Sequence, residues 1–160
     1  TPLYSSAASD VYKRQAYASH YAALSYGGAG LNAVHGIAYA VAGLTHATHG
    51  STNAVMLPYV LDALRTERPA ELLEVASLFG IETKDPVAAV AQVPVVIRNL
   101  IGELGIPTNL REFGVGREHL GDLTRDALAV TRLAKAFPVA DVPATYARII
   151  DAAWHGKLGD

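Results

Sequence analysis

The sequence lacks cysteine, and it has few of the features that direct a chain to a membrane or to nucleic acid. Without cysteine, disulfide bonds and thiolate metal sites are excluded. No apolar run approaches the roughly 18–20 residues of a membrane span, and no basic head followed by an apolar stretch marks a secretory signal. A net charge of −2 gives no basic excess for nucleic acid. We therefore expect no membrane partner and no nucleic-acid partner, and a cytoplasmic protein fits these absences.

Long strand-like alternation of apolar and polar residues is also missing, and helical periodicity dominates from residue 16 onward. Proline and glycine fall where helices would begin or end, with Gly27, Gly43 and Gly121 as expected ends or breaks. Pro58 and Pro94 are expected to kink or interrupt their helices, and residues 105–116 are expected to form a loop. The predicted fold class is all-α, a compact bundle of about seven helices. The predicted helices cover residues 16–26, 31–42, 49–64, 70–79, 86–104, 117–136 and 142–154.

The first fifteen residues need a separate interpretation. Residues 5–15, SSAASDVYKRQ, read as a literal translation of a transposon-end adapter used to prepare DNA sequencing libraries. Such segments are excluded from fold reasoning. Residues 1–15 are therefore interpreted as a non-native tail, and the native sequence is expected to start near Ala16, with its true N-terminal part missing.

Three of the six histidines lie close together in VHGIAYAVAGLTHATHG, residues 34–50. His35 and His49 are 14 residues apart, which is about 21 Å on a continuous helix. They can ligate one metal ion only if the chain reverses between them, and residues 43–45 could provide that reversal. His46 could share a face with His49, because the two are three residues apart. Hydrogen-bonded histidines inside an apolar core remain the alternative at this point.

A glycine-rich stretch, GAGLNA at residues 28–33, matches the dinucleotide fingerprint in letters only. That fingerprint follows a β-strand, whereas an alanine-rich segment without a β-branched run precedes this one. We therefore interpret these glycines as a tight turn between two closely packed helices.

The histidine segment and its continuation, residues 29–62, resemble the metal-site segment of the iron-containing (group III) alcohol dehydrogenases. The family has a histidine, a 14-residue spacing to a second one, and then the block H-G-x-x-N-A-x-x-L-P-x-V. Downstream, GELGIPTNLREFGV and FPVADVPATYARIIDAAW also resemble the family, so the resemblance spans residues 17–154. The matching positions are Gly30-Leu31, His35-Gly36, His49-Gly50, Asn53-Ala54, Leu57-Pro58 and Val60.

This resemblance implies a two-domain parent with an N-terminal nucleotide-binding domain and a C-terminal helical domain. Residues 16–160 would be the helical domain, as also found in the dehydroquinate synthase-like fold, and the nucleotide-binding domain would be missing. The family holds a divalent metal, with iron expected first and zinc as the alternative, on one aspartate and three histidines. Two of these histidines match His35 and His49, whereas the other two ligands and the NAD or NADP cleft lie upstream of the match.

Two further positions are site candidates by the same resemblance. Tyr39 stands where many family members carry a histidine near the nicotinamide, so it is a candidate catalytic residue or a residue of the cleft wall. A tyrosine keeps a hydroxyl but does not titrate near neutral pH. His46 is a candidate for the substrate side or a surface residue. No residue of this chain is expected to bind the nicotinamide cofactor directly.

The sequence therefore predicts a fragment of a metal-dependent, NAD(P)-linked alcohol dehydrogenase that interconverts an alcohol with an aldehyde or ketone and is inactive alone. Its partners would be a small-molecule alcohol or aldehyde and the missing N-terminal domain, and the parent could form a homodimer. Two alternatives stay open: a glycerol-dehydrogenase-like relative of the same fold, and a metal-free helical interaction domain in which the histidines are core residues.

Overall fold

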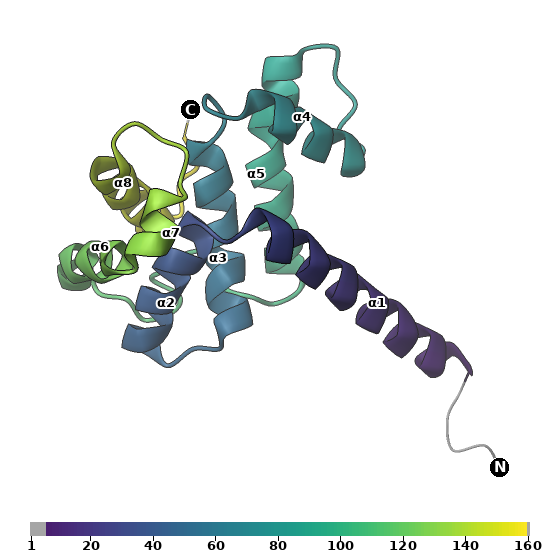
Figure 1. Ribbon diagram of the computed structural model, residues 1–160, viewed down its shortest axis with the longest axis horizontal. Helices are drawn as coiled ribbons and strands as arrows, with labels where there is room; N and C mark the ends of the chain where they lie inside the picture. The colour runs from purple at the N-terminus through teal and green to yellow at the C-terminus, as the bar shows by residue number, and fades with distance from the viewer. Residues whose placement is uncertain (1–5, 160) are drawn as a thin grey trace. The chain divides into compact units, whose positions relative to one another are not determined.

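The computed structural model describes residues 6–159, and these residues form helices without any strand (Figure 1). The all-α prediction is therefore confirmed, with eight α-helices and one short 3-10 helix among the described residues where about seven helices were expected. None of the described helices combines the length and the apolar composition that crossing a membrane requires. The elements are α1 Ser6–Ala29, α2 Ala33–Thr45, α3 His49–Ala63, α4 Pro69–Leu78, α5 Pro86–Glu103, η1 Arg117–His119, α6 Leu120–Ala129, α7 Thr131–Lys135 and α8 Val142–His155.

The first of two compact units, residues 1–31, consists of helix α1 in its described part. The sequence predicted a non-native tail at residues 1–15. Residues 1–5 of this tail lie outside the described residues, whereas residues 6–15 belong to α1. Helix-forming side chains and an ion pair between Arg14 Nε and Asp10 Oδ2, four residues apart at 2.9 Å, favour this earlier start. The predicted end of this helix at Gly27 was wrong. The helix passes this residue and ends before Gly30, whose φ of 83° gives the left-handed conformation of a helix end.

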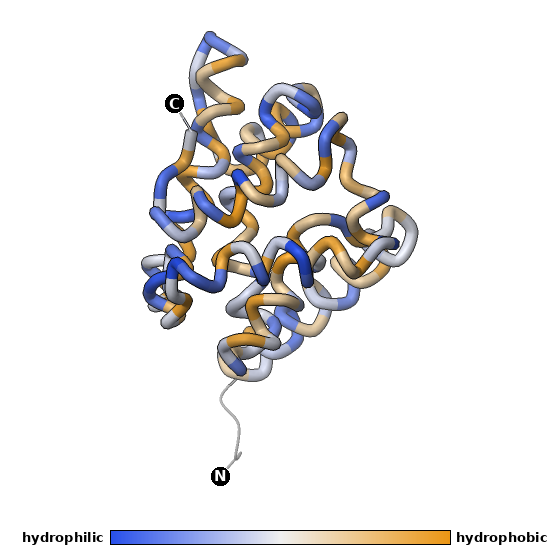
Figure 2. The backbone as a smooth tube through the Cα atoms, turned by 90° about the vertical axis from the view of Figure 1, so that its left-hand side faces the viewer, coloured by the Kyte–Doolittle hydropathy of each residue, from blue (hydrophilic) through white to orange (hydrophobic). Residues whose placement is uncertain are grey.

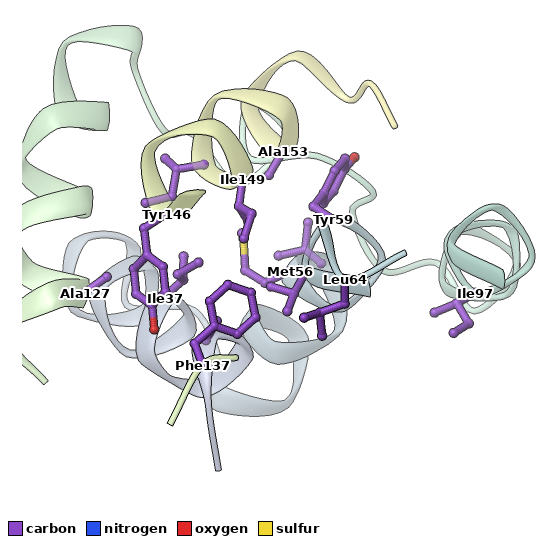
Figure 3. Packing of buried hydrophobic residues seen from close by; sticks show 14 of the residues in the cluster. Ile37, Met56, Tyr59, Leu64, Ile97, Ala127, Phe137, Tyr146, Ile149 and Ala153 are labelled. Atoms are coloured by element: carbon purple, nitrogen blue, oxygen red, sulfur yellow. The ribbon is translucent and has the colours of Figure 1, made fainter. Parts of the chain in front are cut away.

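The second unit, residues 32–160, holds the hydrophobic core, which gathers around α2 and α3. Helix α3 packs against α2, α5 and α8, while α6 packs against α2 and α8. Figure 3 shows Ile37 of α2, Met56 and Tyr59 of α3 and Ile149 of α8 meeting in this core. Apolar and polar segments alternate along the helices (Figure 2), as expected where each helix buries one face.

The starts of α4, α5 and α8 agree with the sequence prediction because their signals are local. The Asp85 carboxylate accepts a hydrogen bond from the backbone N–H of Val87 at 3.0 Å and caps α5. Asp141 caps α8 in the same way through the N–H of Ala144, also at 3.0 Å. Pro69 opens α4, where its missing N–H leaves no helical hydrogen bond unmade.

Helix breaks agree less well. Helix α2 continues through Gly43 to Thr45, and the break between α6 and α7 lies at Val130, whereas Gly121 lies inside α6. Pro58 and Pro94 are buried inside α3 and α5, which are not interrupted there. A single glycine costs a helix only about 1 kcal/mol relative to alanine, so burial of the surrounding apolar residues outweighs it.

The predicted loop at residues 105–116 is confirmed, and hydrogen bonds attach it to two helices of the core. Tyr59 Oη donates to the carbonyl of Thr108 at 2.5 Å, and Trp154 Nε1 donates to the carbonyl of Val115 at 2.9 Å. The N–H of Leu110 donates to the carbonyl of Ala153 at 2.9 Å. The loop therefore has its place fixed by α3 and α8.

A close approach between α2 and α8 leaves one polar atom without a partner. The Tyr146 side chain is fully buried, and its hydroxyl has no hydrogen-bond partner among the described residues. Burial raises the pKa of this phenol to about 12. A Cβ added at Gly36 would lie 3.3 Å from this hydroxyl oxygen and 3.6 Å from Leu133 Cβ. Gly36 thus leaves room for the Tyr146 hydroxyl, although a glycine inside a helix lowers the stability of that helix.

This contact predicts that Gly36→Ala and Tyr146→Phe are coupled. Tyr146→Phe alone should be neutral or stabilising, because it removes an unpaired buried hydroxyl. In that background Gly36→Ala should stabilise by about 0.5–1 kcal/mol through helix propensity, since its nearest obstacle is gone. In the native background the gain should be smaller or reversed. Thermal or urea unfolding of the four proteins measures the coupling, and equal effects of Gly36→Ala in both backgrounds would contradict it.

Candidate metal site between helices α2 and α3

The chain reverses between α2 and α3 at residues 46–48, three residues later than the sequence predicted. His46 ends α2 with φ 56° and ψ 17°, the left-handed conformation, and its N–H donates to the carbonyl of Ala42 at 2.9 Å. Thr45 Oγ1 donates to the carbonyl of Val41 at 2.8 Å and accepts from the N–H of Ala47 at 3.3 Å. These contacts turn the chain so that α3 starts at His49 beside α2 (Figure 1).

This reversal brings together the imidazoles of His35 and His49. Their ring centroids lie 5.4 Å apart, and the ring planes are tilted by 57°. Two imidazoles on one ion, with metal–nitrogen bonds of about 2.1 Å, have centroids about 5 Å apart. The pair therefore has a spacing that suits two ligands of one metal ion.

The surroundings of His35 favour the neutral form that a metal requires. Its side chain is half-buried, and burial lowers the pKa of His35 below its usual value, with the neighbouring His49 lowering it further. Neutral imidazole carries the free lone pair that coordinates a metal. The lowered pKa of His35 and the distance between the two rings therefore both suit metal binding.

Tyr39 lies against both histidines. Its ring stacks on His49 with centroids 5.1 Å apart and planes within 10°, and it meets His35 edge-on at 6.3 Å. Tyr39 and His35 share a face of α2 because they are four residues apart. The Tyr39 side chain is 44% exposed, so one side of this aromatic group remains open.

Asn53 contacts His49 from the next turn of α3, a contact that the sequence interpretation had missed. Its Nδ2 donates to the carbonyl of His49 at 2.9 Å and lies 2.9 Å from Nε2 and 3.3 Å from Nδ1 of the same residue. Asn53 Oδ1 is buried and has no hydrogen-bond partner in the described part of the chain. The four-residue spacing between His49 and Asn53 was the sequence signal that could have revealed this pair.

His46 does not join this group. It is exposed at the end of α2, and no ring contact or side-chain hydrogen bond links it to His35 or His49 within residues 8–159. Its backbone conformation has a structural role in the reversal. The substrate-side role predicted for its side chain remains a prediction.

The described residues bring two imidazoles together but form no larger cluster of metal-ligating side chains. Among them no group of three or more histidine, aspartate or glutamate side chains could hold a metal ion. Two adjacent imidazoles and an unpaired amide oxygen nevertheless fit one side of a divalent metal centre. A complete set would need further ligands from outside these residues.

A groove lies elsewhere in the second unit, and neither His35 nor His49 lines it. It is lined by α3, α4, α5, α8 and the residues after α8, with Asp62, Arg98 and Arg148 among its charged groups. Arg98 Nη1 donates to the carbonyl of Gly156 at 3.1 Å, and Arg148 Nη2 donates to Thr145 Oγ1 at 3.1 Å. These charges are already engaged in structural contacts, so the histidine pair is the better candidate for chemistry.

Comparison with known proteins agrees with the resemblance found in the sequence. The profile described as "Fe-containing alcohol dehydrogenase family, C-terminal" matches residues 5–150. The chain belongs to this family. It is 30% identical over 142 residues to long-chain-alcohol dehydrogenase 1 of Geobacillus thermodenitrificans, which covers 88% of this chain and 36% of that protein. It is also 30% identical over 125 residues to the NAD-dependent methanol dehydrogenase of Bacillus methanolicus, covering 74% of this chain and 32% of the relative.

Solved structures of this family share the fold. A structure described as a crystal structure analysis of 1,3-propanediol oxidoreductase superposes with a TM-score of 0.71 at 28% identity, covering 78% of this chain and 33% of that chain. The chain thus spans about a third of the length of these Fe-containing alcohol dehydrogenase relatives. The predicted helical fold class of the family's C-terminal domain is confirmed.

The reversal predicts the effect of glycine at position 46. A side chain in the left-handed region costs energy that glycine avoids, so His46→Gly should stabilise the chain by about 0.5–1 kcal/mol. His46→Val should destabilise it, because a β-branched residue fits this conformation poorly. Urea unfolding of the three proteins gives the order, and a destabilising His46→Gly would contradict this account of the turn.

Proposed function

We propose that this chain is the metal-binding helical part of a metal-dependent, NAD(P)-linked alcohol dehydrogenase. The observation that supports the proposal is the adjacency of the His35 and His49 imidazoles, which come from two helices of a family member. The relatives it matches are about three times as long, so a nucleotide-binding part and two further ligands would come from the remainder of such a protein. The substrates would be a small alcohol and the corresponding aldehyde or ketone.

Each residue of the pair would have a definite task. His35 and His49 would each present a neutral ring nitrogen, iron being the first candidate and zinc the alternative for the ion they bind. When bound, the metal supplies Lewis acidity toward the substrate oxygen, and a nicotinamide accepts or returns the hydride. Tyr39 would cover one face of His49, which limits the directions from which water and substrate can approach that ring.

Tyr39 would also place a hydroxyl at the open side of the site. A phenol can donate and accept hydrogen bonds, but it stays protonated near neutral pH. It could therefore orient a substrate oxygen, whereas a histidine at this position could also exchange a proton. His46 would contribute through its backbone turn, with its side chain as the candidate for the substrate side.

The proposal predicts that zinc binding by the chain depends on both histidines. His35→Ala and His49→Ala should each weaken Zn²⁺ affinity by about tenfold or more, because each removes one of two ligands. His119→Ala is the matched control, since the ring of this histidine lies away from the pair and meets the exposed carboxylate of Glu118 at 3.5 Å. Calorimetric titration measures the affinities. Unchanged affinity in both site variants would favour the metal-free helical interaction domain instead.

A second prediction concerns activity. The chain with ferrous or zinc ions, NAD or NADP and a panel of small alcohols should show no turnover above the metal-only control. The physical reason is that two ligands and no nucleotide-binding part leave the substrate and the hydride acceptor unpositioned. Absorbance of the reduced nicotinamide at 340 nm is the measurement. Clear turnover that His35→Ala abolishes would overturn the claim that this part is inactive alone.

A further inference from the structure

The groove formed by α3, α4, α5, α8 and the residues after α8 has no task in the proposed metal chemistry, because neither His35 nor His49 lines it. Its volume is about 1430 Å³, whereas sites for small molecules usually measure roughly 300–1,000 Å³. The groove is partly open to solvent. These dimensions suit an elongated ligand better than a compact one.

The side of the groove that α5 forms is apolar over most of its length. Val87, Ala91 and Val95 line it at intervals of four residues, which places them on one face of the helix, and Arg98 follows on that face three residues later. Leu73 of α4 lines the same groove. The side chains of Leu73, Val87 and Val95 are exposed, so this apolar stripe has no covering element in the second unit.

The charged groups that line the groove are mainly positive, although the whole chain has a net charge of −2. Four arginine or lysine side chains and two aspartates line it. Asp62 is already paired with Arg65, with 2.9 Å between Oδ1 and Nε. Arg98 and Arg148 donate to neutral oxygens, and neither they nor Lys157 forms an ion pair among the residues that the structure describes. The groove therefore favours a negatively charged ligand.

Two of these cations lie at the same end of the groove. Arg98 Nη1 donates to the carbonyl of Gly156 at 3.1 Å, and Lys157 is the next residue along the chain. The second aspartate of the lining, Asp151, faces His155, with 3.4 Å between Oδ2 and Nδ1. Since Arg98 also ends the apolar stripe of α5, the groove combines an apolar side with a cationic end.

We propose that this groove binds a long-chain carboxylate, with its alkyl chain along the α5 stripe and its carboxylate at Arg98 and Lys157. A guanidinium group pairs with a carboxylate through charge-assisted hydrogen bonds, and the alkyl chain covers the exposed apolar side chains. The helix rises about 16 Å from Val87 to Arg98. With carbon–carbon bonds of about 1.5 Å, an extended chain of roughly twelve carbons spans a similar length.

The first test varies the ligand. Dodecanoate, kept below the concentration at which it forms micelles, should bind the chain saturably with a stoichiometry of about one in a calorimetric titration. Dodecanol lacks the charge and dodecyltrimethylammonium reverses it, so each should bind at least tenfold more weakly. Acetate keeps the charge without the alkyl chain and should show no binding at the same concentration.

The second test varies the cationic end of the groove. Lys157→Glu reverses one charge of the lining and should weaken dodecanoate binding by about tenfold. Lys135→Glu is the matched control, because Lys135 is an exposed lysine of α7 that does not line the groove, and it should leave the affinity unchanged.

The third test varies the apolar side. Leu73→Ser should weaken dodecanoate binding by about tenfold, because it removes apolar surface that the alkyl chain would cover. Leu78→Ser is the matched control, since Leu78 belongs to the same helix, is exposed and does not line the groove. Val87→Ser should also weaken binding, and this side chain is exposed enough for the change to leave the fold intact.

The outcomes separate this site from the histidine pair. His35→Ala and His49→Ala should bind dodecanoate like the native chain, so a failure of this proposal would leave the proposed metal site untouched. Equal binding of dodecanoate and dodecyltrimethylammonium would overturn the proposal, as would native affinity in Lys157→Glu and Leu73→Ser. Absent dodecanoate binding would overturn it too, and binding of an acidic amphipathic peptide instead would assign the groove to a protein partner.

Discussion

The packing of α2 against α3 is the constraint on which the candidate site depends. His35 and Tyr39 lie on one face of α2, whereas Ile37 and Val41 are fully buried in the core. The helical period separates these two sets, because residues two apart point about 200° away from each other around the axis. The driving force for pairing the helices is burial of their apolar residues, worth about 25 cal/mol per Å² of area. The imidazoles are therefore brought together by residues that take no part in their chemistry.

The turn at His46 determines which residues of α2 and α3 lie side by side, and so it places His49 next to His35. Helix α2 ends with a non-glycine residue in the left-handed region, a conformation that costs about 1–2 kcal/mol. The side chain of Thr45 bonds to backbone groups on both sides of the bend and offsets part of that cost. A reversal at Gly43 would have ended α2 earlier than Thr45. It would also have shifted the start of the following helix relative to His35. The position of the turn is thus coupled to the geometry of the histidine pair.

The sequence predicted the helix starts better than the helix ends, for a physical reason. A start depends on a local signal, such as the Asp85 carboxylate with Pro86 or Asp141 with Pro143, and these signals act within one turn. An end depends on how much apolar surface the next turn can bury, which is a property of the whole fold. Helices α2 and α6 continue through Gly43 and Gly121, because burial of neighbouring apolar residues outweighs the small free-energy cost of a glycine in a helix.

The candidate site was predictable in its residues but not in its contacts. The 14-residue spacing and the need for a reversal led from sequence to the adjacency that His35 and His49 have in the structure. The stacking of Tyr39 and the hydrogen bonds of Asn53 depend on side-chain rotamers, which no spacing rule supplies. Asn53 in particular stood out in the sequence only as a position that matches the family block. The burial of its unpaired Oδ1 depends on how the surrounding side chains pack, which the sequence alone does not give.

Exposure of the pair is itself informative about how such a site would be completed. His49 is exposed, Tyr39 is nearly half exposed, and neither has a covering element in the second unit. A centre whose ligands come from two parts of a protein must lie at the surface of each part, since otherwise the second set of ligands could not reach the ion. A core histidine pair would instead be enclosed and fully hydrogen-bonded. The open face, the lowered pKa of His35 and the unpaired amide oxygen of Asn53 are therefore easier to reconcile with a half-built metal centre than with a metal-free core.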